Sequence, residues 1–269
     1  VESNDPDAPV VDVPVTLNVG GMIPLALEVI AEPTNICDGE SSQLEAIPSG
    51  GTGNYAYEWT SDPPGFTSTD PDPVVYPEET TTYYVVVDDG ENTLQGDITI
   101  VVEHEPDQAS TPEGENSMCW GVYQTVYSTQ GANGALFYNW HLEPEEAGSI
   151  DGVGMTATVT WDEAFTGTAT VMVEGTNNCG MGAMSELLNV DIHELPEVDL
   201  GEDMTVCANE TVELDAGNPG AEYLWSTGAT TQTISVDTTG VGIGTMDIWV
   251  EVTDSESCMN SDTISIQFD

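Results

Sequence analysis

The residues of this chain with the clearest covalent chemistry are its five cysteines. Cys37, Cys119 and Cys207 each precede a Tyr-x-Trp motif, whereas Cys179 and Cys258 stand in turns rich in Asn, Asp and Ser. The spacing predicts one disulfide between Cys119 and Cys179 and another between Cys207 and Cys258, each within one repeat. Cys37 is left as a free thiol, either buried and inert or joined to another chain. Paired cysteines indicate an oxidising, extracytoplasmic location.

Carboxylates supply a second chemistry, the binding of calcium. Of the 269 residues, 49 are Asp or Glu, and calcium takes several oxygen ligands from flexible loops. No ordered calcium-loop motif is present, so solvated acidic loops are the alternative interpretation. The candidate metal ligands lie in two turns and in the linkers, and they are Asp88, Asp89, Glu91, Glu103, Glu105, Asp107, Asp254 and Glu256.

No arrangement of residues predicts catalysis, and the three His residues lack the spacing of a zinc site. The chain has no Lys or Arg, which gives a formal net charge of −49. It therefore offers no cationic surface to nucleic acid or anionic lipid. No stretch approaches the roughly 18 apolar residues of a membrane-spanning helix. We expect no enzymatic activity, no nucleic-acid partner, no membrane span and no cofactor other than calcium.

The absence of Lys and Arg has three candidate explanations. Trypsin-like proteases cut only after these residues, so selection for protease resistance is the first. Tolerance of salt or calcium is the second, because dense carboxylates repel one another and cations screen them. An unexplained compositional bias is the third.

The elements that must position these groups are β-strands. The chain is rich in Val, Ile, Thr, Tyr and Trp, which favour strands, and its 27 Gly and 16 Pro supply turns. Three copies of Tyr-x-Trp at a regular period are typical of tandem Ig-like sandwiches. We predict an all-β fold with an N-terminal extension at residues 1–24 and three sandwich domains at 25–105, 106–195 and 196–269.

In each Tyr-x-Trp motif the two rings point to the same face of a strand. We expect these aromatic side chains to fill the sandwich cores, and a sugar-binding platform is the alternative. They are Tyr57, Trp59, Tyr138, Trp140, Tyr223 and Trp225.

The N-terminal extension contains a strand pattern that fits no repeat. Apolar residues occupy every odd position from 11 to 19, and Pro14 favours a sheet edge. The strand either belongs to the first domain or a preceding repeat, or completes a sheet of the next subunit and builds a head-to-tail homopolymer. In the second case the polymer contacts are Val11, Val13, Val15, Leu17 and Val19.

Longer stretches of the three repeats resemble the PKD-like and Ig-like tandem repeats of secreted Bacteroidota proteins. The stretches that carry the resemblance are Val198–Cys207, Leu224–Ile234, Ile36–Glu40, Tyr55–Trp59, Tyr138–Trp140 and Asn178–Gly180. The resemblance covers residues 25–269 and implies Ig/PKD-like sandwiches in cell-surface adhesins or gliding-associated filaments exported by the type IX system. It implies no catalytic residue. The missing second cysteine of the first repeat and the absence of a Lys-bearing C-terminal sorting domain depart from the family, as does the lack of Lys and Arg.

The sequence therefore predicts a non-enzymatic extracellular structural protein, a subunit or segment of a protease-resistant surface filament or adhesin. One alternative is a glycan- or protein-binding module, which exposed aromatic side chains at one loop end would favour. Another is an accessory region of a secreted hydrolase.

Overall fold

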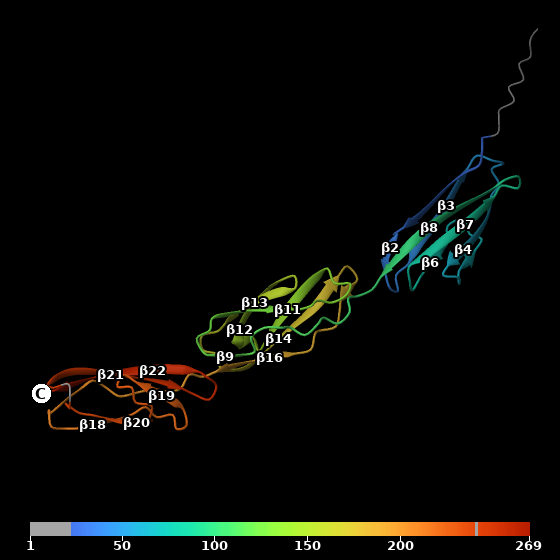
Figure 1. Cartoon of the computed structure of the whole chain (residues 1–269). Helices are drawn as coiled ribbons and strands as arrows, with labels where there is room; N and C mark the ends of the chain where they lie inside the picture. Colours follow the sequence, from blue (N-terminus) through green and yellow to red (C-terminus); the bar gives the residue numbers. More distant parts are fainter. Residues whose placement is uncertain (1–22, 240–241) are drawn as a thin grey trace, which may run out of the picture. The chain divides into compact units, whose positions relative to one another are not determined.

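In the part of the chain that the structure describes, the regular elements are β-strands apart from one short 3-10 turn, η1 (Glu145–Ala147). The computed structural model describes residues 23–239 and 242–269 (Figure 1). The predicted donor strand at residues 11–19 lies outside them. Among the described residues, no helix is long and apolar enough to cross a membrane. The chain divides into two compact units, one ending at His104 and one spanning Glu105–Asp269.

The first unit holds one sandwich of two sheets, with strand orders β1-β3-β6 and β2-β8-β7-β4-β5. Period-2 alternation explains the strands, since β7 buries Thr81, Tyr83, Val85 and Val87 and turns the residues between them outward. The strands are β1 (Ala26–Glu32), β2 (Asn35–Cys37), β3 (Ser42–Ser49), β4 (Ala56–Asp62), β5 (Thr67–Ser68), β6 (Val74–Val75), β7 (Thr81–Asp88) and β8 (Thr93–Glu103).

The second unit holds two further sandwiches with the same plan. The second sandwich pairs sheets β10-β13-β12 and β11-β14-β16-β9, with β15 beside β14. The third pairs β18-β20 with β17-β22-β21-β19. The strands are β9 (Ser117–Cys119), β10 (Gln124–Ser128), β11 (Phe137–Glu143), β12 (Gly148–Val153), β13 (Thr156–Trp161), β14 (Gly167–Asn177), β15 (Gly180–Met181), β16 (Leu188–His193), β17 (Met204–Val206), β18 (Val212–Asp215), β19 (Glu222–Trp225), β20 (Thr233–Val236), β21 (Gly244–Thr253) and β22 (Met259–Phe268).

Each sandwich has its own apolar core, and one tryptophan of a Tyr-x-Trp motif is buried in each. Trp59 and Trp225 are almost fully buried and Trp140 is 9% exposed. Each indole Nε1–H donates to a backbone carbonyl, which satisfies its one polar group inside the core. The tyrosines of the motif are half-buried and pack against the same cores; they are Tyr57, Tyr138 and Tyr223. The prediction of core aromatics and of an all-β tandem fold is confirmed.

Candidate functional site

Three of the cysteines occupy the same place in the three sandwiches. In each sandwich a three-residue strand near the start runs parallel to the last strand: β2 to β8, β9 to β16 and β17 to β22. The cysteine stands at the end of this short strand or directly after it, opposite the last residues of the sandwich. The residue after each cysteine then donates its N–H to a carbonyl at that end: Asp38 to Glu103, Trp120 to His193 and Ala208 to Asp269. Cys37, Cys119 and Cys207 are therefore structurally equivalent.

The other two cysteines share a different place, the turn that follows a long strand. Cys179 directly precedes β15 and Cys258 directly precedes β22. In both turns a side-chain oxygen of Asn or Asp holds the loop: Asn177 Oδ1 accepts from the N–H of Cys179 at 2.8 Å, and Asp254 Oδ1 accepts from that of Cys258 at 2.8 Å. This bond fixes the backbone that presents the sulfur.

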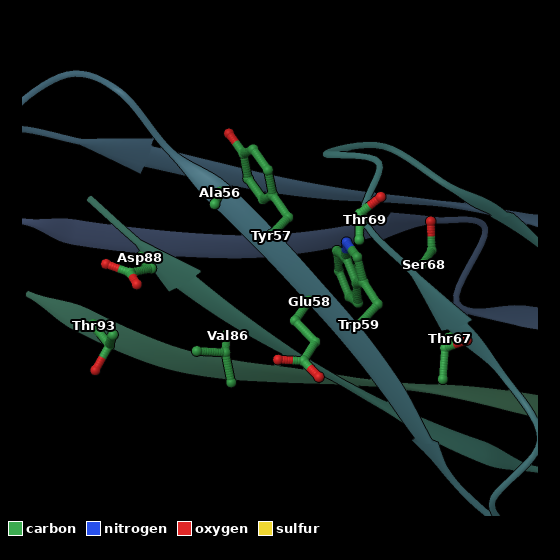
Figure 2. Close-up of a pocket in the computed structure, with 10 residues that line it drawn as sticks. All are labelled: Ala56, Tyr57, Glu58, Trp59, Thr67, Ser68, Thr69, Val86, Asp88 and Thr93. Atoms are coloured by element: carbon green, nitrogen blue, oxygen red, sulfur yellow. The ribbon is translucent and has the colours of Figure 1, made fainter. Parts of the chain in front are cut away.

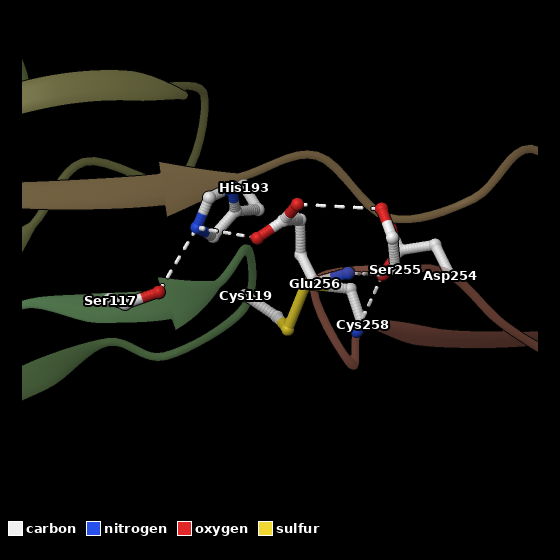
Figure 3. The surroundings of a disulfide bond; sticks show 7 residues. All are labelled: Ser117, Cys119, His193, Asp254, Ser255, Glu256 and Cys258. Carbon is white, nitrogen blue, oxygen red and sulfur yellow. Dashed lines mark hydrogen bonds and ion pairs between the residues drawn. A yellow bond between two sulfur atoms is a disulfide. The ribbon is translucent and has the colours of Figure 1, made fainter.

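One disulfide joins a cysteine of the first kind, next to a short strand, to a cysteine of the second kind, in a turn of the following sandwich. Cys119 of the second sandwich is bonded to Cys258 of the third, with a Cα–Cα distance of 5.4 Å and a sequence separation of 139 residues (Figure 3). Cys258 is fully buried. The bond therefore fastens the end of one sandwich to the turn between the last two strands, β21 and β22, of the next.

The predicted pairings Cys119–Cys179 and Cys207–Cys258 are wrong. Cys207 is a free, exposed thiol, and Cys37, predicted to be free, is disulfide-bonded, as is Cys179. The reason is strand length. In the third sandwich Cys207 lies beside the end of β22 while Cys258 directly precedes its start, and the 10-residue strand between them spans about 30 Å at about 3.3 Å per residue. A disulfide needs Cα atoms within about 7 Å.

Polar side chains accompany the disulfide at this junction (Figure 3). Ser117 Oγ lies 3.0 Å from His193 Nε2, and the same nitrogen lies 4.0 Å from Glu256 Oε2 of the third sandwich. Asp254 Oδ1 also accepts from the N–H of Glu256 at 2.9 Å, so the turn that carries Cys258 also positions this carboxylate. A disulfide and a His–carboxylate contact thus join the second and third sandwiches.

The predicted calcium ligands are not gathered in one place. Within residues 23–239 and 242–269, no group of three or more His, Cys, Asp or Glu side chains could hold a metal ion. Asp89 serves its own turn instead: the N–H groups of Glu91 and Asn92 donate to its carboxylate and hold the pKa of Asp89 below the ordinary value. Asp88 accepts from the N–H of Gly90, and Asp254 holds the equivalent turn of the third sandwich. Calcium binding stays a prediction.

A groove of about 740 Å³ lies along one edge of the first sandwich (Figure 2). It follows β4, which pairs with β7 over its full length but with β5 only at Trp59 and Thr60. Among the described strands, none pairs with the outer side of residues 56–58. Tyr57 and Glu58 point to opposite sides of β4, and the hydroxyls of Thr67, Ser68, Thr69 and Thr93 line the walls together with the Asp88 carboxylate. Ala56 and Val86 also line it, so the groove is an open strand edge with both polar and apolar walls.

Comparisons with known proteins agree with this architecture. Residues 105–190, most of the second sandwich and the segment before it, match the family model of a PKD-like domain. An I-band fragment of titin is similar in structure, with a TM-score of 0.52 and 13% identity over 92% of this chain and 99% of that fragment. An E-to-A variant of the three-Ig titin fragment gives a TM-score of 0.51 with the same identity and coverage. No curated protein matches the chain.

These likenesses show a tandem Ig/PKD-like fold. The disulfides add the location, because such bonds persist in oxidising compartments. The chain thus has a tandem Ig/PKD-like fold, and its disulfides indicate an extracellular or secreted protein.

Proposed function

We propose that this chain is a non-enzymatic segment of an extracellular filament or adhesin, in which consecutive sandwiches are joined in series by disulfides. The observation that carries the proposal is the bond between Cys119 and Cys258, which spans two sandwiches instead of stapling one. A disulfide within a domain stabilises that domain. One between domains resists their separation and their bending, which is what a spacer under tension requires.

The composition supports the same role. A chain without Lys or Arg presents no cleavage site to trypsin-like proteases, whether folded or unfolded. The ion pairs among the described residues all join a His to a carboxylate, at His104, His141 and His193. Packing, backbone ladders and disulfides must therefore provide the stability of a fibre exposed to foreign proteases.

We further propose that the chain polymerises by strand donation into the groove along β4. What supports this is the open outer edge of residues 56–58 together with the alternating pattern of residues 11–19. A strand added there would extend the ladder β7-β4 by one, and backbone hydrogen bonds would supply much of the affinity. Glu58 and Asp88 make this edge acidic, so polymer formation needs salt to screen them from Asp12 of the incoming strand.

Deleting residues 1–23 is expected to abolish filaments while leaving the sandwiches folded. The measurement is electron microscopy and sedimentation at high ionic strength, with circular dichroism as the check on folding. A chain lacking only residues 1–8 keeps the alternating strand and is the matched control, expected to polymerise like the full chain. Filaments that survive the longer deletion, or a full chain that never polymerises, would rule out strand donation.

A binding module for glycan or protein is the second candidate function. The buried tryptophans of the Tyr-x-Trp motifs give it no surface. The loop that follows Cys119 does offer an exposed apolar surface, since Trp120, Val122 and Tyr123 are 42%, 42% and 58% exposed. This exposed aromatic loop belongs to the second sandwich and is the observation that favours a ligand.

A further inference from the structure

The third sandwich has a cysteine at the position equivalent to Cys119, but this cysteine forms no disulfide. Cys207 stands where Cys119 stands, and the N–H of Ala208 donates to the carbonyl of Asp269 at 2.9 Å as that of Trp120 donates to His193 at 2.8 Å. Cys119 is bonded to a turn cysteine of the following sandwich, whereas Cys207 is free and exposed.

The equivalent cysteine of the first sandwich also forms a disulfide. Cys37 is also disulfide-bonded, and its turn is made in the same way as that of Cys207. Cys37 N–H donates to Glu40 Oε2 at 2.8 Å, and Cys207 N–H donates to Glu210 Oε2 at 3.1 Å. In each turn the glutamate N–H donates back to the cysteine carbonyl. The turn that presents a bonded sulfur in the first sandwich is therefore fully formed around the free sulfur of the third.

We infer that Cys207 forms a disulfide with a further Ig-like sandwich, placed after the third as the third is placed after the second. That sandwich must carry a cysteine in the turn before its last long strand, where Cys258 stands in the third. The inference rests on the proposed role of the chain as a segment in series, and it names the partner of its last sandwich.

A second copy of this chain does not fit as the partner through its first sandwich. The equivalent turn there directly precedes β8, and Asn92 occupies the position of Cys258. The partner is therefore a sandwich of the second or third type. The disulfide therefore does not involve the first sandwich of a second copy, whereas strand donation uses the β4 edge of that sandwich.

The bond forms by thiol–disulfide exchange with a small disulfide oxidant such as oxidised glutathione. The Cys207 thiolate attacks one sulfur of the oxidant, which gives a mixed disulfide and releases one thiol. The thiolate of the partner cysteine then attacks the Cys207 sulfur and releases the second thiol. Two protein thiols are oxidised to one disulfide, and one oxidant disulfide is reduced to two thiols.

The test appends a second copy of residues 194–269 directly after Asp269 of the full chain. Glu194 then follows Asp269 as it follows His193 in the native junction. After refolding with oxidised and reduced glutathione, the product is alkylated and digested with a protease that cuts after Glu, and its disulfides are mapped by mass spectrometry. A peptide linking Cys207 to Cys258 is expected from most molecules. Native Cys258 is bonded to Cys119, and β22 separates the two cysteines within one sandwich, so this peptide reports a bond from Cys207 of the original chain to the appended copy of Cys258.

The matched control carries Cys258→Ser in the appended copy only. Its Cys207 in the original chain is expected to form no disulfide and so to be alkylated. The native Cys119–Cys258 bond in the same molecules reports whether junctions of this type form at all, so its absence would count against the proposed function. If that bond forms and Cys207 of the original chain stays free in the fusion, the inference about Cys207 is overturned. A Cys207-dependent dimer accounting for most of the unfused chain would overturn it as well.

Discussion

Reduction of the intact chain is expected to lengthen its fully stretched form by at least about 450 Å. The bond between Cys119 and Cys258 removes 139 residues from the path of a pulling force and replaces them with a Cα–Cα distance of 5.4 Å. An extended chain spans about 3.3–3.6 Å per residue, which gives this minimum of about 450 Å. Any further disulfide only increases the difference between the reduced and oxidised lengths.

Single-molecule force spectroscopy with handles at the two chain ends measures this length directly. The comparison is between chains kept oxidised and chains reduced and alkylated, each pulled until every sandwich has unfolded. The physical meaning is that the oxidised segment does not extend through its second and third sandwiches. Equal final lengths in the two states would contradict a covalent link between these sandwiches.

Replacing Trp225 with alanine is expected to destabilise the third sandwich by about 3–5 kcal/mol, the range for removing a large buried aromatic side chain. Trp225 is 1% exposed, and its indole donates to the carbonyl of Thr231 at 2.7 Å. A typical domain has only about 5–15 kcal/mol of stability. The substitution therefore opens the third sandwich far more often than the native chain does.

Hydrogen exchange followed by pepsin digestion and mass spectrometry resolves the effect by segment. Strands β21 and β22 should lose protection in the Trp225→Ala variant, while the first sandwich keeps it. Trp249→Ala is the matched control, because Trp249 is 41% exposed on β21 and its loss should cost clearly less than the loss of Trp225. Equal loss of protection in both variants would contradict the burial of Trp225 as the source of stability.

The fold was predictable because its signals are local. Alternation within one strand fixes which face is buried, as the pattern of Tyr83, Val85 and Val87 in β7 shows. The Tyr-x-Trp repeat likewise located one buried tryptophan in each sandwich. Both arguments need only the residues of a single strand.

The disulfide partners were not predictable from the same signals, because they depend on which end of a sandwich each cysteine occupies. Cys207 pairs with nothing in its own sandwich because the full length of β22 separates it from Cys258. The signal that could have shown this is the strand count between the two cysteines. A cysteine in the first short strand and one in the last hairpin turn lie at opposite ends, so only consecutive sandwiches bring them together.

The role of the acidic turns also depended on backbone geometry. Asp89 and Asp254 looked like calcium ligands in the sequence, but each accepts N–H bonds from its own turn. Asn177 holds the same kind of turn in the second sandwich without a charge. A residue pattern that suits both a metal loop and a self-bonded turn does not distinguish them.

The most direct test of a serially linked segment is a disulfide map of the native, unreduced chain. Alkylation of free thiols, digestion after Glu or Asp residues and mass spectrometry identify the linked peptides without any need for trypsin. The structure predicts a peptide containing Cys119 linked to one containing Cys258, with Cys207 alkylated. Linkage of Cys119 to Cys179, or of Cys207 to Cys258, would place each bond inside one sandwich and contradict the account.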